Sequence, residues 1–183
     1  MRRSKGLAVL LACGALGSAC QAAPAGKGGW TEDFAAAQVR AKEAGRPILA
    51  DFTGSDWCGW CMKLDREVFS QGEFRKYAAE NLVLFMADFP QARQQSAKVA
   101  RQNAGLQKKY DIQGYPTVLL LDADGKVLGQ TGYKPGGPAA YVRHLGELLT
   151  QSGWQAPKTA APAAAASNAP AFKPAPVYNG RQK

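Results

Sequence analysis

Short apolar runs in the middle of the chain predict the strands of a sheet. Residues 48–52 and 82–87 read "ILADF" and "LVLFMA", and such runs are typical of strands that are buried on both faces. A third apolar run, residues 117–121, is followed by the turn letters "DADG" and by a return strand over residues 126–131. This pattern predicts a β-hairpin in which Gly125 supplies the positive φ of the turn.

Amphipathic segments between these strands predict five helices. Thr31 is expected to cap the first helix and Gly45 to end it. Ser70 and Glu73 have the spacing of a capping box for the third helix. The expected ranges are about 31–44, 58–68, 70–80, 96–110 and 138–150. Helices that alternate with strands and then meet a hairpin predict an α/β fold with a mixed central β-sheet flanked by helices.

The first 25 residues predict a signal peptide. A basic head precedes an apolar run that is too short to span a bilayer as a stable helix. Two processing routes are open. The stretch "LGSAC" resembles a bacterial lipoprotein signal, in which Cys20 is lipidated and becomes the new N-terminus. The stretch "APA" at residues 23–25 fits ordinary cleavage.

The opposite end of the chain also differs from the middle. Ala and Pro supply 15 of the 31 residues from 153 to 183, which predicts a disordered Ala/Pro-rich tail. Residues 26–152 are then expected to form a single folded domain. The net charge of the chain is +9, but residues 21–152 hold 16 basic and 14 acidic side chains. A body so close to neutral argues against nucleic acid as a partner.

Cysteine usage directs attention to one motif, "WCGWC". The chain has four cysteines, and Cys13 and Cys20 fall in the predicted leader. Export would leave Cys58 and Cys61 as the thiols of the mature protein, in a compartment where they can pair. Cysteines at i and i+3 on a helix are neighbours, with a Cα separation that a disulfide tolerates.

The position of the two cysteines favours redox chemistry. Cys58 is expected to begin a helix, where unpaired N–H groups and the helix dipole favour its thiolate and make it the attacking sulfur. Cys61 lies one turn deeper and would resolve a mixed disulfide. A structural zinc site needs about four ligands, and the single histidine, His144, is far along the chain. A purely structural disulfide over so short a ring would stabilise the fold little.

"WCGWC" after a strand, and "GYPT" before a hairpin, resemble the thioredoxin family over about residues 30–151. The longer stretch "DFTGSDWCGWCMKLDREVF" is similar to exported bacterial thioredoxin-like proteins that have an extra residue before the active site. The resemblance implies a thioredoxin fold and a protein-disulfide oxidoreductase. Gly59 and Trp60, the pair between the cysteines, differ from the Gly-Pro of thioredoxin and from the Pro-His or Gly-His of oxidases and isomerases. The direction of electron flow therefore stays open.

The resemblance also assigns residues outside the cysteine motif. Pro116 matches the cis-proline that helps to hold an extended substrate strand, and Tyr115 precedes it as a contact to the partner or as a packing aromatic. Asp51 matches the buried acid that assists proton transfer at Cys61. Burial should raise the pKa of this carboxyl group. The alternative is an ordinary acid at a strand end, paired with a lysine or hydrogen-bonded to the backbone.

The aromatic residues of the motif are interpreted as a contact platform. Trp57 and Trp60 would shield the sulfurs and offer apolar area to an extended partner, together with Gly59. Asp56 is expected to cap the helix or to oppose the thiolate electrostatically. Lys63 is expected on a solvated helix face.

Together these features predict an exported thiol–disulfide oxidoreductase that reduces protein disulfides. Its expected partners are disulfide-containing exported proteins and a membrane-bound thiol–disulfide electron donor, with no metal, cofactor or nucleic acid. The protein is expected to be a monomer in the periplasm or cell envelope, with possible attachment through lipidated Cys20. Two alternatives stay open: an oxidase or isomerase of envelope proteins, and a non-catalytic thioredoxin-like binding module.

Overall fold

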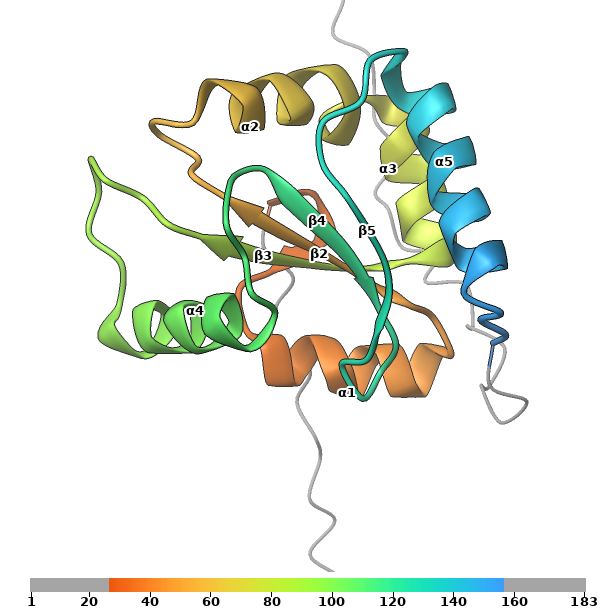
Figure 1. The fold of residues 1–183 in the computed structure, drawn as a ribbon, viewed down its shortest axis with the longest axis horizontal. Coiled ribbons are helices and arrows are strands. Elements are labelled where there is room, and N and C mark those ends of the chain that lie inside the picture. The colour runs from red at the N-terminus through yellow and green to blue at the C-terminus, as the bar shows by residue number, and fades with distance from the viewer. Residues whose placement is uncertain (1–26, 157–183) are drawn as a thin grey trace, which may run out of the picture.

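A computed structural model of the protein describes residues 27–156. The predicted signal peptide, the candidate lipidation site Cys20, and the tail from residue 157 onward lie outside the described residues. The described part is a sheet with helices on both faces (Figure 1). This arrangement confirms the α/β fold class that the hydrophobic pattern and the resemblance predict.

The sheet has five strands in the order β1-β3-β2-β4-β5. The three neighbours β1, β3 and β2 run parallel, and β4 and β5 complete the sheet as an antiparallel hairpin. It is therefore mixed, and the carboxyl ends of β2 and β3 meet at one edge. The strands are β1 (Trp30–Thr31), β2 (Ile48–Thr53), β3 (Val83–Asp88), β4 (Thr117–Leu121) and β5 (Val127–Thr131).

Helices cover the two faces unequally. α1 and α4 lie on one face of the sheet, and α2, α3 and α5 lie on the other (Figure 1). The bounds are η1 (Lys27–Gly29), α1 (Phe34–Ala44), α2 (Gly59–Leu64), η2 (Asp65–Phe69), α3 (Gly72–Asn81), α4 (Ala97–Lys109) and α5 (Gly137–Gln151). η2 is a turn of π-helix that continues α2. Within residues 27–156, none of the helices has the length and hydrophobicity that a membrane span requires.

The alternation of side chains along β2 divides the core into two clusters. Ile48, Ala50 and Phe52 pack with the residues of α1 and α4. Leu49 packs with the residues of α2, α3 and α5. Because successive side chains of a strand point to opposite faces, Asp51 lies on the same face as Leu49, under α2. The strand thus places one acidic side chain inside an otherwise apolar layer.

The start of the first helix differs from the prediction. Thr31 does not cap it, because Thr31 belongs to β1 and pairs with Phe85 of β3. The cap is Asp33, whose Oδ1 accepts a hydrogen bond of 3.1 Å from the N–H of Ala36. The left-handed Gly45 ends the helix as predicted. The strand β1 was missed because two residues are too short to show an alternating pattern.

The predicted capping box of the third helix is also wrong. Ser70 has helical backbone angles and ends η2, and its hydroxyl donates to Asp65 at 3.1 Å. The helix α3 begins after Gln71, whose side chain caps nothing. The extra residue that a π-helical turn takes up moves the helix start past the serine.

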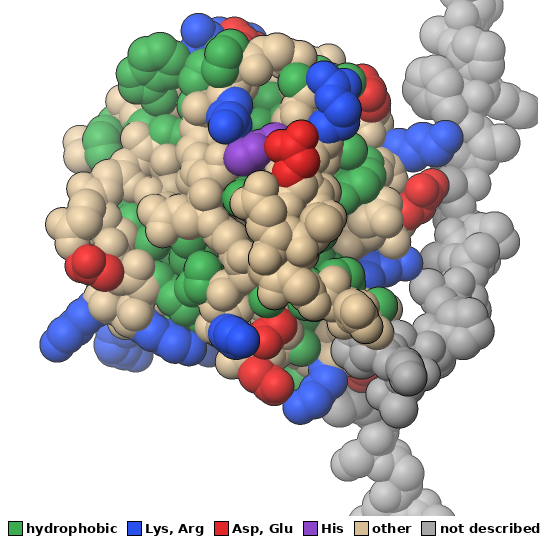
Figure 2. All heavy atoms as spheres, turned by 45° about the vertical axis from the view of Figure 1, so that its right-hand side comes forward, with side chains coloured by type: hydrophobic (Ala, Val, Ile, Leu, Met, Phe, Trp, Pro, Cys, Tyr) green, Lys and Arg blue, Asp and Glu red, His purple; other side chains and the backbone are tan. Residues whose placement is uncertain are grey.

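One face of the domain agrees with its small net charge. On the face shown in Figure 2, acidic and basic side chains are interspersed in a largely neutral surface, and basic side chains gather only along the lower left edge. The face shown in this view lacks the continuous basic character of a nucleic-acid-binding surface.

The two caps predict different responses to mutation. Asp33→Ala should lower the free energy of unfolding by about 1 kcal/mol, because an unpaired N–H is left at the start of α1. Ser70→Ala should change it by less than about 0.5 kcal/mol, since this hydroxyl makes one exposed bond. Urea denaturation of both variants measures the difference. Equal losses would contradict the assignment of the caps.

Candidate active site

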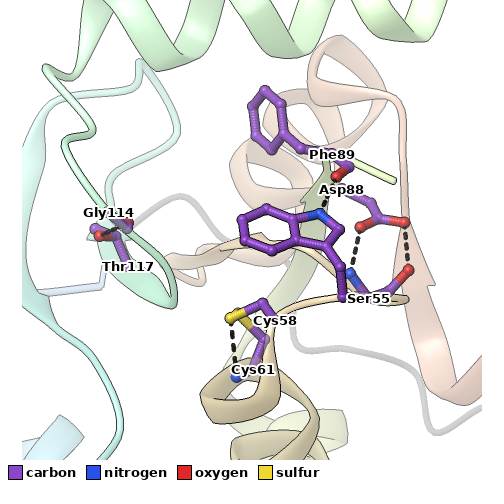
Figure 3. The surroundings of a disulfide bond; sticks show 8 residues. Ser55, Cys58, Cys61, Asp88, Phe89, Gly114 and Thr117 are labelled. Atoms are coloured by element: carbon purple, nitrogen blue, oxygen red, sulfur yellow. Dashed lines mark hydrogen bonds between the residues drawn. A yellow bond between two sulfur atoms is a disulfide. The ribbon is translucent and has the colours of Figure 1, made fainter. Parts of the chain in front are cut away.

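The two cysteines of the motif form a disulfide at the start of α2 (Figure 3). Their Cα atoms are 5.2 Å apart. Cys58 is the N-cap of the helix rather than its first residue, and its Sγ lies 3.2 Å from the backbone N–H of Cys61. The sulfur therefore faces the unpaired N–H groups of the first turn, which stabilise negative charge. Both residues are buried, with exposed fractions of 7% for Cys58 and 4% for Cys61.

Asp51 of β2 lies behind the disulfide. It is buried, and its Oδ1 has no hydrogen-bond partner within the described residues. Burial raises the pKa of Asp51 to about 8, and the nearby carboxylates of Asp65 and Asp88 add to the shift. Asp51, Cys61 and Asp65 line one pocket of about 210 Å³. The carboxyl group and the second sulfur therefore share a space that water can enter.

Asp88, which the sequence analysis did not single out, organises the loops around the disulfide. It ends β3 and is fully buried. Its carboxylate accepts hydrogen bonds from the N–H and the hydroxyl of Ser55, at 2.9 and 2.7 Å (Figure 3), and pairs with Arg93. Its carbonyl oxygen accepts from Asn103 of α4 at 2.9 Å. The only sequence signal for this role is an acid that directly follows an apolar strand.

Two further residues of the loop before the disulfide, Trp57 and Asp56, form hydrogen bonds to the loop after β3. The indole N–H of Trp57 donates to the carbonyl oxygen of Phe89 at 2.7 Å. The carboxylate of Asp56 accepts from the backbone N–H groups of Gln91 and Ala92, at 2.9 and 2.8 Å. These hydrogen bonds lower the pKa of Asp56. The prediction that Asp56 caps α2 is wrong, because Cys58 holds that position.

The indole of Trp57 packs directly on Gly54. A Cβ atom at Gly54 would lie 2.4 Å from the ring, which is too close for any real contact. By contrast, a Cβ at Gly59 would meet open space. Of these two glycines, only Gly54 is required by packing. Trp57 is 41% exposed, so the ring is fixed in place and still offers a free edge.

The loop before β4 faces the disulfide and contains the cis bond that the resemblance implies at Pro116. The Tyr115–Pro116 peptide bond is cis. The turn is closed by the hydroxyl of Thr117, which donates to the carbonyl oxygen of Gly114 at 2.7 Å (Figure 3). The rings of Tyr115 and Trp57 meet edge to face, with centroids 5.8 Å apart. Tyr115 thus packs against Trp57 of the cysteine motif.

Trp60 forms a second aromatic wall with a residue that the sequence analysis missed. Its ring lies 5.2 Å from that of Tyr133, centroid to centroid, and Trp60 is 58% exposed. The ammonium of Lys63 lies about 5 Å from both rings, so this residue is held by cation–π contacts rather than solvated alone. Tyr133 lies in the loop after β5, and no local pattern marks it as a neighbour of the motif.

Metal ligation has little to support it in residues 27–156. No group of three or more His, Cys, Asp and Glu side chains there could hold a metal ion. His144 lies on α5, where its Nε2 is 3.0 Å from the hydroxyl oxygen of Thr131. His144 is therefore a partly buried side chain in contact with β5.

Comparison with known proteins places this site in a family. Residues 34–145 match the thioredoxin-like domain family. The chain belongs to this family. The disulfide bond reductase DsbH of Chlamydia pneumoniae is 39% identical over 118 residues, which cover 64% of this chain and 71% of that protein. A solved structure described as DsbH oxidoreductase has a TM-score of 0.64 at 36% identity, and covers 66% of this chain and 83% of its own.

Further relatives match less of their own length. The thioredoxin-related protein DsbJ of Chlamydia pneumoniae is 33% identical over 56% of this chain, but the match spans 30% of DsbJ. The thiol:disulfide interchange protein DsbD of Yersinia pestis is 30% identical over 58% of this chain and 17% of DsbD. The thioredoxin of Thermus thermophilus, at 16% identity and a TM-score of 0.51, shows the fold alone. The DsbH relatives, together with the Cys58–Cys61 disulfide, show that this chain is a thiol–disulfide oxidoreductase.

The raised pKa of Asp51 predicts how the stability of the oxidised protein depends on pH. Asp51 stays protonated in the folded protein up to about pH 8, whereas it ionises near pH 4 in the unfolded chain. The folded state therefore loses stability as the pH rises between these values. Asp51→Asn removes this loss, so the variant should exceed the parent by on the order of 5 kcal/mol at pH 8 and match it near pH 4.

Denaturation of the oxidised proteins from pH 4 to pH 9 measures this difference. Asp56→Asn is the matched control, because the pKa of Asp56 is lowered and its contribution is lost only in acid. The difference between that control and the parent should stay constant from pH 5 to pH 8. A flat profile for Asp51→Asn as well would refute a raised pKa.

Proposed function

We propose that the protein is an exported reductase of protein disulfides that works through a Cys58/Cys61 dithiol–disulfide cycle. The observation that carries this proposal is that the two cysteine sulfurs lie in different electrostatic environments. Cys58 caps a helix whose free N–H groups favour a thiolate, and Cys61 opens on the pocket of a buried carboxyl group with a pKa of about 8. One environment suits an attacking sulfur and the other a sulfur that must first lose its proton.

The proposed cycle begins from the reduced pair. The Cys58 thiolate attacks one sulfur of the substrate disulfide, a mixed disulfide forms, and the other substrate sulfur leaves as a thiolate that takes up a proton. Asp51, as the carboxylate, accepts the proton of the Cys61 thiol. The Cys61 thiolate then attacks Cys58, and the second substrate sulfur leaves. Two electrons have passed to the substrate, and the Cys58–Cys61 disulfide remains.

The aromatic walls and the cis-proline loop support a substrate-binding role beside the disulfide. Trp57 packs against Tyr115, the residue before the cis-proline, and Trp60 is exposed. In this proposal an extended strand of the partner pairs beside Pro116, while Trp57, Gly59 and Trp60 supply contact area. An open Gly59 leaves room for the partner backbone to approach Cys58.

Export and partners follow from the leader and the relatives. The basic and apolar first 25 residues favour secretion, with Cys20 as a possible lipid attachment point. Disulfide-containing proteins of the envelope are then the substrates. A thiol–disulfide donor in the membrane would return electrons to the cysteine pair, which agrees with relatives named for thiol:disulfide interchange. The direction, reduction, agrees with the relative named as a disulfide bond reductase.

The reduction potential of Cys58–Cys61 tests the direction of electron flow. Equilibration of the mature protein with glutathione or dithiothreitol buffers should give a value near that of thioredoxin, about −270 mV. A value between about −180 and −120 mV would instead identify a donor or isomerase of disulfides and overturn the proposed direction.

Single cysteine variants test the order of attack. Cys58→Ser should abolish the reduction of a protein disulfide such as that of insulin, because no sulfur remains at the helix cap. Cys61→Ser should also abolish turnover, but it should accumulate a mixed disulfide with the substrate that non-reducing electrophoresis detects. If the Cys58→Ser variant accumulates the mixed disulfide instead, Cys61 is the attacking sulfur and Cys58 the resolving one. If the parent protein itself reduces no substrate disulfide, the result would support a non-catalytic binding module.

A further inference from the structure

A second pocket lies at the end of the sheet that is remote from the disulfide. β1, β2 and β3 run parallel, so their amino ends share one edge (Figure 1), whereas Cys58 follows the carboxyl end of β2. The pocket at the amino edge has a volume of about 290 Å³. Its charged lining residues are Arg40 of α1, Arg46 before β2 and Arg75 of α3, and none of its lining residues is acidic.

The three arginines differ in how they are held. The Nη1 of Arg46 donates to the carbonyl oxygen of Ala79 at 2.7 Å, near the end of α3. The Nη1 of Arg40 is buried and has no hydrogen-bond partner among the described residues. Arg75 is exposed at the mouth of the pocket. Within residues 27–156, no carboxylate lies within salt-bridge distance of any of the three.

An unpaired guanidinium N–H that is buried beside open space is costly unless an acceptor enters that space. Three guanidinium groups also repel one another unless an anion lies between them. We propose that this pocket binds a phosphate-type oxyanion, with Arg40 and Arg75 as its main donors and Arg46 as a positioned positive charge. Guanidinium groups suit this ligand because their paired N–H donors match the oxygens of a phosphate group.

Two sources can supply this chemistry, a free phosphate or the headgroup of an anionic phospholipid. The position of the pocket favours the headgroup. Gly28 lines the pocket and lies eight residues after Cys20, the possible lipid attachment point. An extended chain of that length reaches at most about 29 Å. A headgroup held in the pocket would therefore turn the amino edge of the sheet toward the membrane and the disulfide away from it.

The first test measures phosphate binding to the full chain carrying Cys20→Ser, so that no lipid is attached. Titration with inorganic phosphate, followed by the rise in unfolding temperature, should show saturable stabilisation. Arg40→Gln should weaken binding about tenfold through the loss of one charge-assisted contact. Arg75→Gln, at an exposed position, should do the same without risk to folding. Arg101→Gln on α4 is the control with the same change in charge, and it should leave binding unchanged.

Flotation with vesicles distinguishes the two sources. Vesicles of phosphatidylcholine with phosphatidylglycerol should carry the Cys20→Ser chain, vesicles of phosphatidylcholine alone should not, and Arg75→Gln should reduce the bound fraction. Phosphate binding without flotation would support the site with a free anion as its ligand. The proposal is overturned if phosphate does not bind, or if Arg101→Gln weakens binding as much as Arg40→Gln. Disulfide reduction should be unchanged in every variant, so failure here leaves the thiol chemistry unaffected.

Discussion

The carboxylate of Asp88 is the interaction on which the arrangement of the site depends. It ends β3 in a fully buried position, and its hydrogen bonds and ion pair join β3 to the loop before the disulfide and to the loop before α4. A buried carboxylate without partners is costly, so these loops cannot separate without leaving charge unpaired. Trp57 and Asp56 form further hydrogen bonds between the same two loops that Asp88 joins. The loop that leads to Cys58 is therefore held by β3 as well as by α2.

Much of the fold could be predicted because apolar runs report burial directly. β2, β3 and the hairpin lie within one residue of their predicted bounds, and the turn at Gly125 has the expected positive φ. The wrong predictions concern residues whose local sequence is compatible with two structures. Thr31 and Ser70 are both good capping residues, yet one pairs in a strand and the other continues a π-helical turn. Pairing with β3 decides the first case, and no local pattern contains that information.

The site was predictable only in the parts that a motif carries. The cysteine spacing indicated the disulfide, and the family resemblance indicated the cis bond at Pro116 and the buried Asp51. Asp88 and Tyr133 were missed because each acts on the motif across more than thirty residues of chain. The electrostatics of the site also depend on distance in space. Asp65 and Asp88 raise the pKa of Asp51 from separate elements, so a sequence shows the acids but not their repulsion.

The contact between Gly54 and Trp57 has a consequence for how this family can change. Because any Cβ at position 54 would collide with the indole, the two positions are not free to vary one at a time. A lineage that first replaces Trp57 with a smaller residue opens space at position 54, whereas the reverse order passes through a strained intermediate. A side chain at position 54 is therefore compatible with this loop only if the indole at position 57 is absent or has moved away.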